Sequence, residues 1–208
     1  MEFENAEVFN FEGALRGMRN PLESWDKGDS GYIDRRFNDL FYIGKNDLDL
    51  AQRLIKAGSE HRKFLRQIFV SVDITAPLYW WKEFDTYKVG TAANSTSTMH
   101  KLASTPITLD CFEMGDYCGF FETPWKNLIA LLEQCRKEYN ETKDRRYWKE
   151  LIRLLPESWL QKRTITMNYE NILNMYQQRR NHKLTEWSKS FCDWVKTLPY
   201  AEELICFE

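Results

Sequence analysis

Apolar and polar residues alternate with a period of two along one segment of this 208-residue chain and with helical spacing along several others. In the first segment, Ile68, Val70, Val72 and Ile74 are apolar, and most residues between them are polar. Successive side chains of a strand point to opposite faces. The pattern therefore predicts a β-strand with one face against a core.

The residues before that strand predict an amphipathic helix. Asn46 is a favourable N-cap residue, and Gly58 is a favourable residue just past a helix end. The apolar face of this helix consists of Leu48, Ala51, Leu54 and Ile55. These positions recur three and four residues apart, which is the spacing of one buried helix face.

Two further helices are predicted to form a helical hairpin. Thr123 caps the first, with Pro124 in its first turn, and the second runs from about Asp144 to Leu155, where Pro156 ends it. Their apolar stripes are Trp125, Leu128, Ile129, Leu132, Cys135 and Tyr139 in the first, and Trp148, Leu151, Ile152 and Leu155 in the second. We expect these side chains, including the aromatic ones, to belong to the core.

The last third of the chain predicts a short strand, a helix from Tyr169 to about Arg180, and a final continuous helix. The stripe of the final helix is Leu184, Trp187, Phe191, Trp194, Val195 and Leu198. In the preceding helix, Arg179 continues the apolar face three residues after Tyr176. Such an arginine either lays its aliphatic part along apolar surface or meets an anion at the rim of a pocket.

Residues 1–20 alternate early, at Val8, Phe9 and Phe11, which predicts a strand. The segment GALRGMRNP that follows contains two glycines and a proline, which predicts a turn. This turn would present Arg16 and Arg19. The two arginines could meet an anion, but we expect them to be solvated, which is the commoner state of arginine.

Length and composition describe one globular domain, residues 1–208, with 43% hydrophobic and 29% charged residues. A net charge of -2 gives no basic field that would favour nucleic acid or a membrane surface. No apolar run approaches the roughly 18 residues of a membrane span. The five cysteines are scattered, and none has zinc-site spacing. We therefore expect a cytoplasmic protein that has no structural metal and binds neither nucleic acid nor a membrane.

The stretch Pro77–Lys101 has the composition of a ligand-binding segment. It opens with the aromatic and charged run YWWKEFDTYK and then changes to the small polar run GTAANSTST. Glycine allows a backbone to come close to a ligand, and hydroxyl groups and Asn94 supply short hydrogen-bond donors. This predicts a cradle for a polar ligand, with phosphate as the leading candidate. A Ser/Thr-rich connection between two elements is the equal alternative.

The order of these parts resembles the flavin-dependent thymidylate synthases. Residues 87–100, YKVGTAANSTSTMH, fall on that family's signature, Arg-His-Arg-x-x-Ser-x-Asn-Glu-x-Ser-x-Arg-Tyr, and Asn94 and Ser97 match it. Shifted by one residue, positions 86–88 would take the place of Arg-His-Arg. In the C-terminal part, Lys162 falls at the family's uridylate-contacting arginine, and Asn168 and Arg179 match an Asn and the Arg that follows it.

The resemblance implies an α/β (α+β) fold with an antiparallel sheet flanked by helices, assembled as a homotetramer. It implies methylation of dUMP with flavin adenine dinucleotide (FAD), a reduced nicotinamide and methylenetetrahydrofolate. The nucleotide-binding residues it implies are Asn94, Ser95, Ser97, His100, Lys162 and Arg163. The cofactor-binding residues it implies are Tyr87, Lys88, Asn168 and Arg179.

Several charged groups of the signature are replaced here. Of Arg-His-Arg only Lys88 keeps a charge, while Ser95 stands in place of Glu and Met99 in place of Arg. A lysine lacks the planar fork that holds a phosphate by two parallel hydrogen bonds. The favoured hypothesis is therefore a nucleotide-binding protein that senses or sequesters a nucleotide. The alternatives are an active FAD-dependent thymidylate synthase, and a scaffold or interaction protein with a vestigial pocket.

Overall fold

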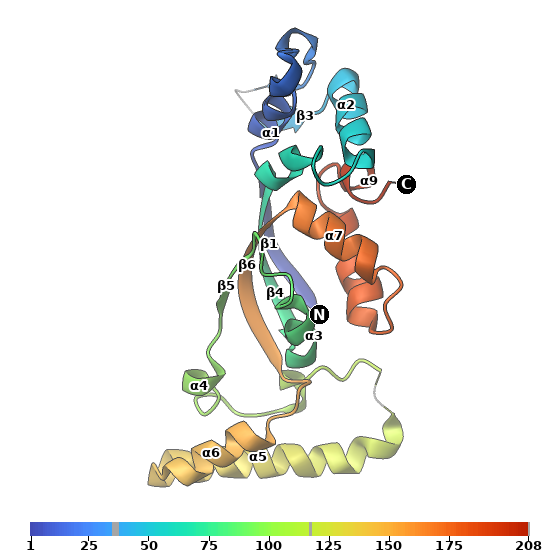
Figure 1. The fold of residues 1–208 in the computed structure, drawn as a ribbon. Coiled ribbons are helices and arrows are strands. Elements are labelled where there is room, and N and C mark those ends of the chain that lie inside the picture. Colours follow the sequence, from blue (N-terminus) through green and yellow to red (C-terminus); the bar gives the residue numbers. More distant parts are fainter. Residues whose placement is uncertain (35–37, 117, 208) are drawn as a thin grey trace. The chain divides into compact units, whose positions relative to one another are not determined.

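The structure is a computed structural model that describes residues 1–34, 38–116 and 118–207. Its main sheet is antiparallel and has four strands in the order β1-β4-β6-β5 (Figure 1). These strands are β1 (Glu2–Phe9), β4 (Phe69–Pro77), β6 (Leu160–Asn168) and β5 (Ala92–Ser95). A second, two-stranded antiparallel sheet pairs β2 (Gly31–Asp34) with β3 (Asn38–Tyr42).

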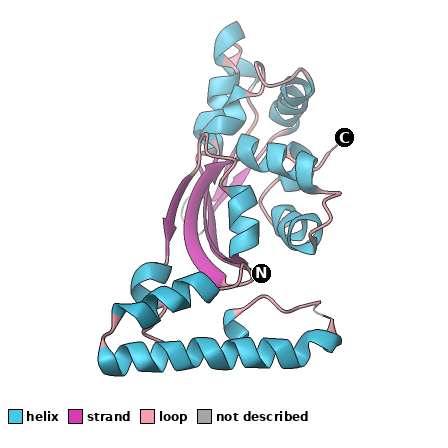
Figure 2. Cartoon of the chain, turned by 60° about the horizontal axis from the view of Figure 1, so that its bottom comes forward, coloured by secondary structure: helices cyan, strands magenta, loops and turns pink. Residues whose placement is uncertain are grey.

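Helices make up most of the remaining regular structure (Figure 2). The α-helices are α1 (Phe11–Met18), α2 (Lys45–Lys56), α3 (Leu78–Phe84), α4 (Thr98–Lys101), α5 (Glu122–Thr142), α6 (Arg145–Leu154), α7 (Tyr169–Arg179), α8 (Cys192–Lys196) and α9 (Ala201–Leu204). Short 3-10 turns lie at Asn20–Leu22, Trp25–Lys27, Lys63–Gln67, Leu109–Cys111 and Gly119–Phe121, and a π-helical segment at Glu186–Phe191. No helix in the described part of the chain is long and apolar enough to cross a membrane.

The chain divides into two compact units, each built from several segments. Unit 1 consists of Met1–Glu2, Asp73–Thr86 and Asn94–Thr164. Unit 2 consists of Phe3–Val72, Tyr87–Ala93 and Ile165–Glu208. Because the chain passes from one unit to the other several times, the division does not follow the order of the sequence.

The predicted alternation is confirmed in β4. Val70, Val72 and Ile74 are fully buried, whereas Phe69 is 44% exposed. Ile68, just before the strand, is also buried and accepts a hydrogen bond from the backbone of Tyr169 at 3.0 Å. The period-two pattern therefore indicated the buried face of the strand correctly.

The helix predicted from Asn46 forms as α2, but its N-cap is Gly44 and its first residue is Lys45, so the predicted cap is wrong. The carboxylate of Asp29 accepts hydrogen bonds from the backbone N–H groups of Asn46 and Asp47, at 2.9 and 3.0 Å. A side chain distant in sequence thus satisfies donors that the local pattern assigns to an N-cap side chain. The predicted stop is confirmed in type, because Gly58 follows the helix with a φ of 106°.

The predicted N-terminal strand forms as β1, but helix α1 follows it in place of the predicted turn. Arg16 is exposed, as expected. Arg19 is only 5% exposed, so the expectation of a solvated side chain is wrong for this residue. Its Nε lies 2.6 Å from Oδ1 of Asp47, and this ion pair explains how a charged side chain can be buried.

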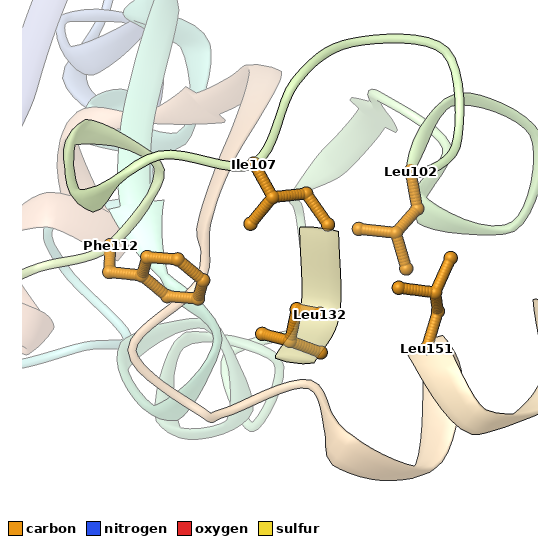
Figure 3. Packing of buried hydrophobic residues seen from close by; sticks show 5 residues of the cluster. All are labelled: Leu102, Ile107, Phe112, Leu132 and Leu151. Carbon is orange, nitrogen blue, oxygen red and sulfur yellow. The ribbon is translucent and has the colours of Figure 1, made fainter. Parts of the chain in front are cut away.

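In unit 1, α5 and α6 form the predicted helical hairpin (Figure 1). Figure 3 shows the five buried residues of the adjoining cluster, Leu102, Ile107, Phe112, Leu132 and Leu151. The predicted cap at Thr123 is wrong, because α5 begins at Glu122 with Phe121 as its N-cap. Trp125 and Trp148 are only half-buried, whereas Leu132 and Leu151 are fully buried, so the fully buried residues of the hairpin are leucines and not aromatic residues.

The final helix is not continuous as predicted. Residues Glu186–Phe191 adopt π-helical geometry, and α8 continues only from Cys192 to Lys196. The predicted apolar stripe is nevertheless buried from Trp187 onward, with Trp187 and Phe191 fully covered and Trp194 7% exposed, whereas Leu184 is half-buried. The periodicity therefore identified the buried face, although the helix geometry changes along it.

Candidate functional site

Within unit 1, the predicted nucleotide-binding residues lie on β5, in the turn after it and on β6. Asn94 and Ser95 are exposed at the end of β5. The backbone N–H of Thr96 donates to the carbonyl oxygen of Lys162 on β6 at 2.9 Å. The chain from Asn94 to Thr96 is thus attached to the strand that carries Lys162.

Ser97 and His100 are joined by a helix cap. The Ser97 hydroxyl accepts a hydrogen bond from the backbone N–H of His100 at 3.2 Å, and Ser97 is the N-cap of the four-residue helix α4. A serine hydroxyl that accepts one hydrogen bond can still donate its own proton. His100 is exposed at the same turn.

Lys162 and Arg163 have different partners. Neighbouring residues of a strand point to opposite faces. The Nζ atom of Lys162 lies 3.8 Å from Oδ2 of Asp73, and its side chain is 41% exposed. Nη1 of Arg163 lies 2.8 Å from Oδ1 of Asp85, and its side chain is 15% exposed. The structure does not bring the two cationic ends together, and Lys162 is the more accessible of the two.

The predicted cofactor-binding residues all lie in unit 2, and two of them are in direct contact. Nε of Arg179 donates to the hydroxyl of Tyr87 at 2.8 Å. The Arg179 guanidinium also faces the rings of Tyr87 and Trp187, at 5.6 and 5.1 Å from their centroids. The arginine that continues the apolar face of α7 therefore packs on aromatic rings, where cation–π attraction contributes to its position.

Asn168 is the N-cap of α7 and is 7% exposed. Its side chain accepts from the backbone N–H of Asn171 at 3.0 Å, and the Asn171 side chain donates to the carbonyl oxygen of Val89 at 2.7 Å. Gly90 has a φ of 79°, and a Cβ there would lie 3.0 Å from Nδ2 of Asn168. A glycine is needed here both for the left-handed backbone and for the close approach of the asparagines. Next to this turn, Lys88 is exposed.

The sequence reasoning missed an arginine–glutamate cluster beside the start of α7. Glu170 is 7% exposed and pairs with both Arg62 and Arg66. Nε of Arg62 lies 3.2 Å from Oε1 of Glu170, and Nη2 of Arg62 donates to Asn174 at 2.8 Å. The basic run around residue 62 was visible in the sequence, but no local signal joined it to a glutamate more than a hundred residues later.

Among the described residues, no group of three or more His, Cys, Asp or Glu side chains is arranged to hold a metal ion. The side-chain donors gathered around β5 and α4 are instead hydroxyl, amide, imidazole and ammonium groups. These groups suit the oxygen atoms of a phosphate or a base.

Comparison with known proteins gives a clear result at the level of structure only. No protein-family model matches the sequence, and no curated protein sequence matches it. The structure is similar to a flavin-dependent thymidylate synthase, ThyX, from Helicobacter pylori complexed with FAD and dUMP. The TM-score is 0.73 at 15% sequence identity, covering 99% of this chain and 98% of that chain.

A second ThyX structure from Helicobacter pylori, also with FAD and dUMP, gives a TM-score of 0.72 at 17% identity over 99% of this chain and 97% of that one. The structure is also similar to a UMP/dUMP methylase, PolB, from Streptomyces cacaoi, bound with 5-Br dUMP. The TM-score is 0.58 at 15% sequence identity, covering 99% of this chain and 96% of that chain. The chain has the fold of the flavin-dependent thymidylate synthases, which confirms the predicted fold class.

Proposed function

We propose that this chain binds a pyrimidine nucleotide of the dUMP type. One observation carries the proposal: three proteins that share the fold over 96–98% of their own length were each solved with dUMP or its 5-bromo derivative. The nucleotide is common to all three structures, whereas FAD is named for two of them. Nucleotide binding is therefore the property that the shared fold best supports.

The residues of unit 1 support a place for this nucleotide. Asn94, Ser95 and His100 are exposed, and the Ser97 hydroxyl lies at the same turn. Lys162, on the strand joined to Thr96, supplies a partly exposed positive charge. We assign Lys162 and Ser95 to the phosphate and Asn94 to the base or sugar, because an ammonium group and a hydroxyl suit a phosphate and an amide suits a base edge.

The residues of unit 2 fit FAD only in part. Lys88 is an exposed cation, but the guanidinium of Arg179 packs on two rings and donates to the hydroxyl of Tyr87. This leaves fewer accessible cations for a pyrophosphate than the family signature implies. We therefore propose that the protein binds the nucleotide without requiring flavin, in a sensing or sequestering role. The two FAD-containing neighbours keep an active flavin-dependent dUMP methyltransferase as the second candidate.

The deciding experiment is an absorbance spectrum of purified protein, before and after incubation with FAD and removal of the excess, together with calorimetric titration of dUMP. We expect saturable dUMP binding and no retained flavin bands. Retained flavin would favour the enzyme, and dUMP methylation would then be assayed. If the protein binds neither dUMP nor FAD, nucleotide binding is contradicted and the scaffold hypothesis is left.

Lys162→Ala tests the assigned phosphate contact. Loss of a charge-assisted hydrogen bond should weaken dUMP binding by about 1–3 kcal/mol. Lys82→Ala is the matched control, because Lys82 is also a lysine of unit 1 but pairs with Glu157 at 2.5 Å with its side chain 69% exposed. Equal dUMP affinity of the wild-type protein and Lys162→Ala would contradict the assignment.

A further inference from the structure

Gln161 is a polar residue of β6 that is only 8% exposed, and both ends of its amide are used. Nε2 donates to the carbonyl oxygen of Thr96 at 2.8 Å, and Oε1 accepts from Nε of Arg163 at 3.0 Å. The orientation of this amide follows from its neighbours, because a guanidinium can only donate and a carbonyl can only accept. The two hydrogen bonds therefore act as one oriented link.

Arg163 is itself fixed by an aromatic ring and a carboxylate. Its guanidinium lies 4.2 Å from the ring centroid of Trp81, and its Nη1 lies 2.8 Å from Oδ1 of Asp85. Trp81 is fully buried and donates from Nε1 to the backbone carbonyl of Gln161 at 2.9 Å. A stacked and ion-paired arginine offers one rigid donor to the amide.

The backbone N–H and the backbone carbonyl of Thr96 are both hydrogen-bonded to residues of β6. Its N–H donates to the Lys162 carbonyl at 2.9 Å, and its own carbonyl accepts from Gln161 at 2.8 Å. The residues on either side of Thr96 are Ser95, which we assign to the phosphate, and Ser97, for which the resemblance implies a nucleotide contact. An exposed end of a strand would otherwise be free to shift, since few buried contacts restrain such segments.

We propose that Gln161, oriented by Arg163, is a positioning residue that holds Ser95 and Ser97 for the nucleotide. This inference rests on the proposed function, and it assigns Arg163 to the support of the site and not to the phosphate. A positioning residue matters because a loosely held binding group costs affinity when it is ordered on binding.

The test is Gln161→Glu, which keeps the shape of the side chain and its contact with Arg163. A carboxylate cannot donate to the Thr96 carbonyl, so we expect the Kd for dUMP to rise about tenfold, within the range for loss of one buried hydrogen bond. Gln52→Glu is the matched control. Gln52 also donates from Nε2 to a backbone carbonyl, that of Glu203 at 3.2 Å, but it lies in unit 2. The Kd of the Gln52→Glu variant for dUMP should equal that of the wild-type protein.

A second measurement separates positioning from a general loss of structure. The Ser95→Ala change should cost less affinity in the Gln161→Glu background than in the wild-type background, because a displaced serine contributes less. Gln161→Met, which removes both hydrogen bonds without adding charge, replaces Gln161→Glu in these titrations if the latter does not fold, with the same expected result.

The outcomes are distinguishable. Wild-type protein that does not bind dUMP overturns the proposed function and this inference with it. Wild-type protein that binds dUMP, with an unchanged Kd for Gln161→Glu or fully additive effects of the two changes, overturns the positioning role alone.

Discussion

Asp47 is the buried carboxylate around which the N-terminal part of unit 2 is organised. Its side chain is 4% exposed and accepts hydrogen bonds from Nε of Arg19, from the backbone of Asp29 and from both the backbone and hydroxyl of Ser30. A buried charge is tolerated only when it is paired and its remaining acceptor sites are satisfied. Arg19, the neighbours Asp29 and Ser30, and Asp47 itself come from three separate segments, so this carboxylate links them.

Asp47→Ala should lower the free energy of unfolding by about 3–5 kcal/mol, because it leaves the Arg19 charge buried without its partner. Asp49→Ala is the control, since Asp49 pairs with Arg53 on the surface with side chains 66% and 68% exposed. That change should cost about 0.5 kcal/mol or less. Urea denaturation of the three proteins measures both values, and equal losses would contradict the role of Asp47.

The stability difference between wild-type protein and Asp47→Ala should shrink in acid. Burial alone would raise the pKa of Asp47, but hydrogen bonds from Ser30, Arg19 and Asp29 and the charge of Arg19 together lower it. An unfolded aspartate has a pKa of about 3.9. As the pH falls below about 5, the unfolded state therefore takes up the proton first, and stability is lost until the pH passes the lower, folded-state pKa.

The measurement is urea denaturation of both proteins between about pH 7 and the acid limit of the folded state. A difference that stays constant, or grows, below about pH 4 would show that the folded-state pKa of Asp47 is not lowered.

At the scale of elements, the periodicity of apolar residues predicted the buried faces of helices and strands better than it predicted where the helices begin. The hairpin of α5 and α6 formed as predicted, yet α5 begins at Glu122 and not after a Thr123 cap. Contacts with the preceding segment help hold α5 in place: Glu133 accepts from the backbone N–H of Ile107 at 2.9 Å and pairs with Arg136 at 2.7 Å. Hydrogen bonding to Arg136 lowers the pKa of Glu133 to about 2.

Leu132→Ala should destabilise the protein by about 2–5 kcal/mol, because Leu132 is fully buried between Leu151 and the other residues of the unit 1 cluster. The adjacent Leu131 is 45% exposed, so Leu131→Ala should cost about 0.5 kcal/mol or less. The pair shares side-chain type and helix propensity, so the difference measures burial alone. Thermal and urea unfolding of the two variants check it, and similar losses would contradict the packing of α5 against this cluster.

At the scale of the whole molecule, we propose a homotetramer, as the resemblance implies. Several large apolar side chains are exposed in the single chain: Phe120 is 83% exposed and Phe121 51% in unit 1, and Leu22 is 84% exposed in unit 2. The rings of Phe120 and Phe121 contact each other, with their centroids 5.2 Å apart, and adjoining exposed apolar side chains of this kind mark interaction surfaces. Such a surface suits an interface between identical chains, which most soluble oligomers form.

Light scattering at micromolar concentration should give four times the 25.0 kDa mass of one chain. A mass equal to one chain over a tenfold concentration range would contradict the assembly. The dUMP titration tests the nucleotide site independently. A monomer in light scattering would therefore contradict the tetramer and leave the nucleotide-binding proposal unchanged.

The sequence by itself determined the local pattern and, through the resemblance, the fold class. It predicted the buried face of β4, the hairpin of α5 and α6, the helix α7 and the buried stripe of the last helices, because burial of one face imposes a period that any local window reveals. The resemblance to the flavin-dependent thymidylate synthases predicted the fold that the solved structures share.

Only the tertiary structure decided which polar groups meet. Asp29 caps α2, Arg19 is buried against Asp47, and Gln161 holds the carbonyl of Thr96 across 65 positions of sequence. Such pairings depend on how distant segments are brought together, and a polar side chain carries no local mark of its eventual partner. In the same way, the resemblance implies nucleotide contacts for both Lys162 and Arg163, and only the structure shows that Lys162 pairs with Asp73 and Arg163 with Asp85.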